Sequence, residues 1–158
     1  MATNVLGTWH VLSAAEVESL TRVVYLSSGQ VFGFAEGEGT PDRLPIDDSF
    51  PLLAARPYGL SKRLAEEMCE AWTSRTGIPT VVLRPVMILS DHLLAGMSRD
   101  QAEFDSFVHV DDVADAIHRA LTVELVGCSR VTLCGPGAFD TSRARQVLEW
   151  QSSYEWPT

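Results

Sequence analysis

The hydrophobic and polar positions of the chain follow a helical period in two long segments. Apolar residues at positions 5, 9, 12 and 15 predict an amphipathic helix over residues 4–17. The clearest helix runs from Tyr58 to Thr76, because a proline precedes it and Gly77 with Pro79 forms a stop signal. On this second helix the pattern predicts an inner face of Leu64, Met68, Ala71 and Trp72, and an outer face of Lys62, Arg63, Glu66, Glu67 and Glu70.

Short apolar runs alternate with these helices and have the composition of buried strands. Both faces of such a run are apolar, as a strand in a parallel sheet requires. Strands separated by helices of this length imply βαβ units, so we expect an α/β fold with helices on both faces of a parallel sheet. The predicted extended segments are 22–27, 80–84, 107–110 and 130–134.

The remaining segments are expected to be irregular or to form short helices. Residues 29–57 are rich in glycine and proline, which predicts a long loop of the kind that often carries function. Residues 86–106 also read as irregular. Asp111 or Asp112 is expected to cap a helix that ends near Thr122. A final helix is predicted near 142–150.

Composition narrows the class of protein. The length of 158 residues, with 46% hydrophobic and 21% charged residues, predicts one globular domain over 1–150 and a loose tail over 151–158. The net charge is −9 and no basic cluster exceeds Lys62-Arg63, which argues against nucleic-acid and anionic-membrane partners. The sequence shows no signal-peptide pattern, and its three cysteines form no C-x-x-C pair, so we expect a cytoplasmic protein.

Candidate chemistry lies at the ends of two predicted strands and at the start of the clearest helix. Ser27 and Ser28 follow the first strand at its carboxyl end, the edge where open α/β sheets bind ligands. Tyr58 and Lys62 lie four residues apart, so they share one face of their helix. A phenol is a poor base at neutral pH, but a nearby ammonium group and a helix N-terminus favour its anion. A serine hydroxyl could then hold a substrate oxygen while the tyrosine moves its proton.

Other interpretations of the same residues are weaker. A tyrosine and a lysine at this spacing occur by chance in many helices, and paired serines after a strand are often turn residues. A serine hydrolase built on Ser28 and His109 lacks the Gly-x-Ser-x-Gly elbow, because Leu26 stands two residues before Ser28. No spacing of histidines supports a metal site.

Several motifs occur together in a recognisable order. The chain strongly resembles the extended short-chain dehydrogenase/reductases, the NAD-dependent epimerase/dehydratase family, over about residues 4–137. The residues that carry this resemblance are Asn4-Val5-Leu6-Gly7-Thr8, Ser27-Ser28-Gly29-Gln30-Val31-Phe32-Gly33, Tyr58-Gly59-Leu60-Ser61-Lys62, Leu83-Arg84-Pro85 and Phe107-Val108-His109-Val110-Asp111-Asp112-Val113-Ala114.

The resemblance implies catalytic roles for individual residues. Tyr58 matches the general acid/base, and Ser28 matches the hydroxyl that bonds the reacting substrate oxygen. Lys62 matches the lysine that bonds the nicotinamide ribose, and Pro85 would lie beside the nicotinamide of NAD or NADP. Asn4 matches an asparagine whose helix packs near the active site. The same resemblance gives Ser27, His109 and Asp111 supporting or structural roles.

The sequence also departs from the family. It contains no GxxGxxG after a first strand, so the fold expected is a partial Rossmann-like, doubly wound parallel sheet without that N-terminal half. We therefore expect this chain alone to bind NAD weakly or not at all; calorimetric titration with NAD and NADP tests this, and micromolar binding would contradict it. The short 85–106 segment puts a nucleotide-sugar substrate in doubt and leaves a smaller hydroxyl or carbonyl compound open.

Two functions stay open at this stage. One is NAD(P)-dependent epimerase, dehydratase or dehydrogenase chemistry on a sugar-like or small-molecule substrate. The other is a truncated, inactive fragment or an interaction remnant of that family. The resemblance also implies a possible homodimer through the helices over 4–17 and 58–76.

Overall fold

A parallel sheet forms the centre of the molecule. The computed structural model describes residues 1–98 and 106–154 of the chain. The main sheet has the order β1-β2-β5, and all its neighbours run parallel, as the alternation of strands and helices predicts. Its strands are β1 (Val23–Leu26), β2 (Thr80–Pro85) and β5 (Cys128–Leu133).

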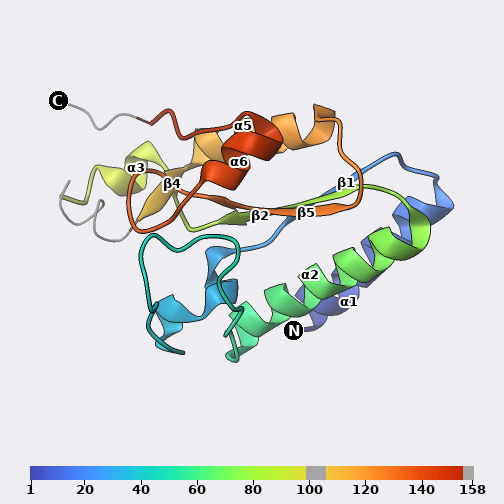
Figure 1. Ribbon diagram of the computed structural model, residues 1–158, viewed down its shortest axis with the longest axis horizontal. Helices are drawn as coiled ribbons and strands as arrows, with labels where there is room; N and C mark the ends of the chain where they lie inside the picture. Colours follow the sequence, from blue (N-terminus) through green and yellow to red (C-terminus); the bar gives the residue numbers. More distant parts are fainter. Residues whose placement is uncertain (99–105, 155–158) are drawn as a thin grey trace.

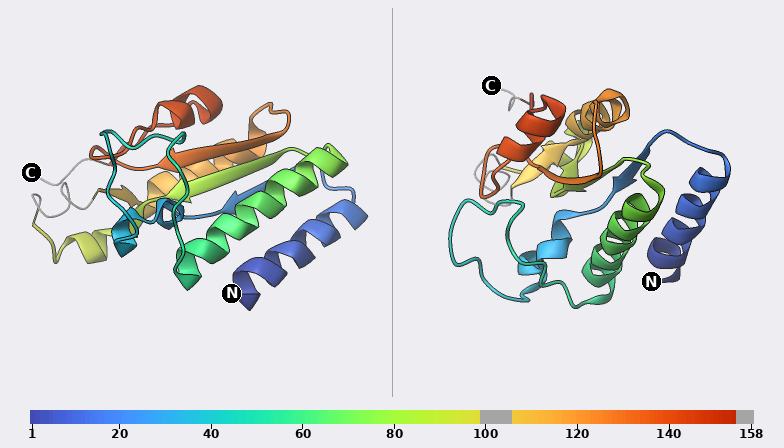
Figure 2. Two further views of the ribbon diagram at one scale, coloured as in Figure 1. Left: turned by 60° about the horizontal axis from the view of Figure 1, so that its bottom comes forward. Right: turned by 45° about the vertical axis from the view of Figure 1, so that its right-hand side comes forward.

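Helices cover both faces of this sheet. Figures 1 and 2 show α1 and α2 together on one face, and α5 and α6 on the other. The predicted three-layer α/β arrangement is therefore present. The bounds of these helices are α1 (Ala2–Val17), α2 (Pro57–Thr76), α5 (Val110–Thr122) and α6 (Ser142–Leu148).

The two outer strands of the main sheet differ from its centre. Every residue of β2 is buried, since β1 and β5 flank this strand and helices cover its two faces. The register places Val82 between Tyr25 and Arg130. β1 bonds to β2 alone, and its last residue, Leu26, is 38% exposed. β1 is therefore an edge strand of the described sheet, and the backbone groups on its outer side have no partner strand among the described residues.

The long segment 29–57 is ordered by an apolar cluster. It contains two short 3₁₀ turns, η1 (Gly29–Phe32) and η2 (Phe34–Glu36). A backbone bridge joins Ile46 to Phe139, and the amide of Ile46 donates to the carbonyl oxygen of Ala138 at 2.7 Å. The segment is therefore fixed to the chain that follows β5. The buried members of this cluster are Val31, Phe32, Ile46 and Phe50.

The segment 86–106 is not wholly irregular, contrary to the prediction from its pattern. Its described part contains β3 (Met87–Leu89) and the short helix α3 (Asp91–Leu94). β3 pairs in parallel with β4 (Phe107–His109), which forms a second, two-stranded sheet. Strands this short leave little periodicity to detect, and their pairing partner lies about 20 residues further along the chain. Residues 99–105 lie outside the described part.

The expected cap of α5 is wrong. The helix begins at Val110, and the imidazole Nδ1 of His109 accepts the backbone N–H of Asp111. The carboxylate of Asp112 instead accepts hydrogen bonds from Ser152 and Ser153, the latter through both its amide and its hydroxyl. Burial alone would raise the pKa of Asp112, but these donors outweigh it and the pKa is lowered. This carboxylate holds residues of the segment expected to be a loose tail.

The inner face of α2 also differs from the prediction. Leu64 is 39% exposed, whereas Glu66, expected in water, is fully buried. The apolar pattern places the inner face part of a turn away from the face that is buried. It does so because hydrophobicity gives no sign that a buried arginine pairs with Glu66. The buried residues of the helix are Gly59, Ser61, Ala65, Glu66, Cys69, Trp72 and Thr73.

No helix in the described ranges is both long and apolar enough to cross a membrane.

Three free cysteines are present, and burial raises the pKa of the Cys69 and Cys134 thiols to about 12. Within residues 1–98 and 106–154, no group of three or more histidine, cysteine or acidic side chains is arranged to hold a metal ion.

Candidate active site

Ser28 lies just beyond the carboxyl end of β1. Its backbone is extended, and its hydroxyl accepts the amide N–H of Gln30 at 3.2 Å, which caps η1. The residue is almost completely buried. The chain turns into η1 at this point, so the serine is held at the edge of the sheet where parallel strands bind ligands.

Tyr58 lies in the first turn of α2, which packs closely against η1. A Cβ atom at Gly59 would lie 2.7 Å from the carbonyl oxygen of Gln30 and 2.8 Å from the Cβ of Ala54. Only glycine permits this approach without a shift of the backbone. As a result, Ser28 and Tyr58 line one cavity of about 660 Å³, and Tyr58 is 47% exposed.

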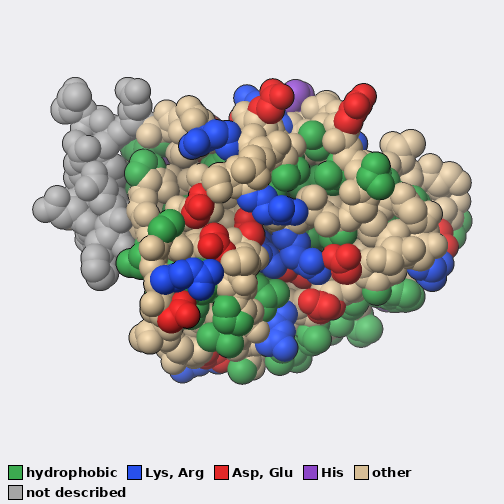
Figure 3. Space-filling model, viewed as in Figure 1, with side chains coloured by type: hydrophobic (Ala, Val, Ile, Leu, Met, Phe, Trp, Pro, Cys, Tyr) green, Lys and Arg blue, Asp and Glu red, His purple; other side chains and the backbone are tan. Residues whose placement is uncertain are grey.

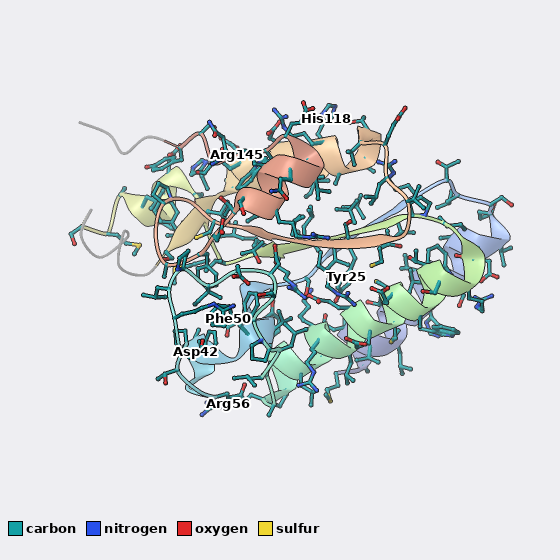
Figure 4. The ribbon with its side chains drawn as sticks, in the orientation of Figure 1. Tyr25, Asp42, Phe50, Arg56, His118 and Arg145 are labelled. Atoms are coloured by element: carbon teal, nitrogen blue, oxygen red, sulfur yellow. The ribbon has the colours of Figure 1, made fainter. Side chains whose placement is uncertain are left out.

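Lys62 lies one helical turn after Tyr58 and reaches the end of β1. Its Nζ donates to the carbonyl oxygen of Leu26 at 2.7 Å and lies 5.2 Å from the centre of the Tyr25 ring. Burial lowers the pKa of the ammonium, and the charge of Glu66 offsets part of that effect. Lys62 lines a separate cavity of about 350 Å³ between α1 and β1. Figure 4 labels Tyr25 in the region between the sheet and α2.

Asn4 and Pro85 support the same region from two other elements. The side chain of Asn4 donates to the hydroxyl of Ser61 at 2.9 Å, and that hydroxyl donates to the carbonyl oxygen of Tyr58 at 2.7 Å. Pro85 is buried at the end of β2, and the next residue, Val86, lines the cavity of Ser28. The sequence-predicted residues thus gather at one end of the sheet, with Ser28 and Tyr58 in one cavity and Lys62 in the neighbouring one.

A buried ionic cluster lies behind Ser28, and the pattern of the sequence did not predict it. Glu66 accepts the hydroxyl of Ser27 at 2.6 Å and pairs with the guanidinium of Arg84 at 2.6 Å. Arg84 also contacts Asp48 at 3.3 Å, and the hydroxyl of Thr132 donates to that carboxylate at 2.7 Å. Burial raises the pKa of Asp48, against the opposing effects of Thr132 and Arg84. This cluster joins α2, β2, β5, the residue that follows β1 and the 29–57 segment.

One signal could have identified Glu66 from the sequence. It follows Lys62 by four residues and Tyr58 by eight, so all three lie along one side of α2. A side of the helix that carries two residues of the candidate site faces the sheet, and a carboxylate on that side needs a buried partner.

His109 belongs to a different environment from Ser28. Its ring stacks on Tyr154 with 4.7 Å between centroids, and its Nδ1 serves as the cap of α5. His109 is not among the residues that line the cavity of Ser28 and Tyr58. The structure therefore offers no support for the serine-hydrolase interpretation.

A family model, curated proteins and solved structures are similar to this chain. A model of the NAD dependent epimerase/dehydratase family matches residues 1–105. A putative UDP-glucose 4-epimerase of Methanocaldococcus jannaschii is 32% identical over 75% of this chain and 44% of its own length. A uronate dehydrogenase of Pseudomonas syringae pv. tomato is 28% identical over 80% of this chain and 42% of its own length.

Among solved structures, RMD from Pseudomonas aeruginosa, in complex with NADPH, superposes with a TM-score of 0.78. It is 19% identical and is matched over 96% of this chain and 68% of that protein, a likeness that shows the fold alone. The chain spans a little over two fifths of the length of the two curated relatives above.

Proposed function

The chain belongs to the NAD-dependent epimerase/dehydratase family, and we propose that it carries the acid/base centre of an NAD(P)-dependent reaction. The reaction is the oxidation, reduction, epimerisation or dehydration of a sugar-like or small hydroxyl or carbonyl compound. The observation that supports this proposal most strongly is the shared cavity of Ser28 and Tyr58, with Lys62 one turn along α2.

In this proposal each side chain has one task. The hydroxyl of Ser28 bonds the substrate oxygen, which orients the reacting carbon, and the phenol of Tyr58 accepts or returns the proton of that oxygen. Lys62 supplies a positive charge on the same side of the helix, which favours the phenolate form of Tyr58. When bound, the nicotinamide group accepts or donates the hydride.

The residues present suit the nicotinamide end of such a cofactor. The ammonium group of Lys62 has three donors, and Leu26 supplies its one hydrogen-bond acceptor among the described residues. Lys62 lines the cavity between α1 and β1, where its remaining donors would bind ribose hydroxyls. Pro85 ends the neighbouring strand, and Pro85 and Val86 would lie beside the ring.

The proposal extends to a homodimer through α1 and α2. Leu6 and Trp9 lie three residues apart on α1 and are about half exposed, and Leu64 of α2 is partly exposed as well. Exposed large apolar side chains are buried when the α1 and α2 helices of a second copy pack against them. Sedimentation velocity tests this extension: a Trp9→Lys variant should run as a monomer where the parent chain dimerises.

The test of the catalytic proposal is turnover of a panel of secondary alcohols, ketones and sugars, with cofactor in large excess. NAD(P)H absorbance follows oxidation and reduction, and NMR of the sugar follows epimerisation and dehydration, which give no net NAD(P)H. Tyr58→Phe should lower the turnover rate ~10²–10⁴-fold, because the proton transfer is lost while the ring stays. Tyr154→Phe is the matched control, since it removes a phenol that lines neither this cavity nor that of Lys62. Equal rates for parent and Tyr58→Phe, or no product from any compound of the panel, would contradict the proposal.

A further inference from the structure

The cavity shared by Ser28 and Tyr58 has a neutral lining. None of its described lining residues carries an acidic or basic side chain. Hydroxyl groups come from Ser28, Tyr58 and Ser106. Much of the remaining wall is apolar and is formed by Phe32, Phe34, Pro41, Ile46, Met87 and Phe139.

The aromatic part of this wall is fixed before any ligand binds. The rings of Phe32 and Phe34 are stacked, with 6.4 Å between centroids and an interplanar angle of 7°. The ring of Phe139 lies 6.1 Å from Phe32, and the backbone bridge between Ile46 and Phe139 holds the two segments together. A ligand therefore meets an ordered surface and does not have to order it.

Two cations that lie over aromatic rings in this region already have partners. Arg84 lies over the Phe32 ring but pairs with Glu66 and Asp48 on the buried side. Arg43 lies 4.1 Å from the centre of the Phe50 ring and contacts Asp47. On the face shown in Figure 3, most basic side chains likewise lie next to acidic ones.

Arg56 is the described cation closest in sequence to Tyr58, but its side chain lies outside the cavity. It is exposed and does not line the cavity. Figure 4 shows it at the lower edge of the molecule, where it points away from the sheet. Among the described residues, no cation is placed to receive a phosphate or a carboxylate inside the cavity.

We propose that this cavity selects uncharged secondary alcohols or ketones with an apolar ring, and discriminates against nucleotide sugars and uronates. The placement of the reacting oxygen at Ser28 and Tyr58 rests on the proposed function; the choice of the neutral class rests on the wall. An apolar ring gains by leaving water for an aromatic surface, whereas a phosphate or carboxylate buried without a cation loses its hydration.

The test is a chemical-shift titration of the ¹⁵N-labelled chain with cyclohexanol, D-glucuronate and UDP-glucose, without cofactor or turnover. Cyclohexanol should shift the amides of Gly29, Phe34 and Ala138, with a dissociation constant at least ~10-fold below those of the two anions. Tighter binding of either anion at these amides would overturn the proposal, as would cyclohexanol that leaves all three unshifted.

Two variants with a matched control sharpen the titration. Phe34→Ala should weaken cyclohexanol binding ~5-fold, whereas Leu121→Ala, which removes an exposed side chain from α5, should not change it. Met87→Lys places a cation on a partly exposed lining position and should tighten UDP-glucose binding ~5-fold. An unchanged affinity of Met87→Lys for UDP-glucose would contradict the electrostatic part of the proposal. Because no turnover is measured, failure here leaves the role of Tyr58 untouched.

Discussion

Ser27 and Ser28 are adjacent in the chain, yet they belong to two regions of opposite character. Ser27 donates to Glu66 in a buried cluster of charged side chains, while Ser28 lines a cavity whose described wall is neutral. The first region joins strands, helix and loop through ion pairs, and the second presents uncharged hydroxyl groups in its lining. The comparison indicates that the buried ion pairs near this end of the sheet serve the scaffold, whereas the cavity of Ser28 and Tyr58 beside them is lined by uncharged groups.

Removing one charge from the buried ionic cluster should have the largest effect on stability. Glu66→Gln leaves Arg84 buried with only part of its counter-charge, so we expect the free energy of unfolding to fall by ~3–5 kcal/mol. Urea denaturation measures this change. Glu67→Gln is the control, because its side chain is largely exposed and contacts Arg130 only at 4.0 Å. Similar small losses in both variants would contradict the structural role of the cluster.

A substitution at the close contact between α2 and η1 should have an intermediate effect on stability. Gly59→Ala places a methyl group against the backbone of Gln30 and the side chain of Ala54, so we expect a loss of ~1–3 kcal/mol. Thermal unfolding gives the stability, and the cyclohexanol titration shows whether the cavity has changed. Gly7→Ala on α1 has open space around the new methyl group and should instead gain ~0.5–1 kcal/mol. A neutral result at Gly59 would show that the close approach of α2 and η1 is not required.

A carboxylate outside both regions allows a smaller, pH-dependent test. The pKa of Asp112 is lowered in the folded chain, so its ionised form stabilises the fold above the unfolded-state value of about 3.9. That stabilisation is lost as the pH falls through the lowered, folded-state pKa. Asp112→Asn should therefore cost ~1 kcal/mol in urea denaturation at pH 7 and converge on the parent chain in acid. A difference that is independent of pH would contradict this origin; Asp115→Asn, on the exposed side of α5, is the control.

The sequence predicted the larger elements well because their patterns are local. The helix from Tyr58 to Thr76 begins one residue earlier in the structure and ends at the predicted residue. Its stop signal works as expected, since Gly77 has a φ of +74° and its amide bonds to Thr73. The parallel order of the sheet follows from the alternation of strands and helices.

The errors came from partners on other elements and from an uncommon capping residue. Glu66 was expected in water because its partner Arg84 is on another element, and only the fold brings them together. His109 caps α5 through a ring nitrogen, whereas the capping preference of aspartate favoured Asp111 or Asp112. The neutral lining of the cavity could not be predicted from the sequence either, because Phe34, Ile46 and Phe139 lie in segments without a regular hydrophobic period.

The central claim is that Ser28 and Tyr58 act together on one substrate oxygen, and a double-mutant cycle on the turnover rate tests it most directly. Rates of product formation would be compared for the parent chain, Ser28→Ala, Tyr58→Phe and the double variant, with cofactor in large excess. If both hydroxyls serve the same oxygen, the double variant should be about as slow as the slower single variant. Losses that multiply, so that the double variant is slower by the product of the two factors, would contradict the claim.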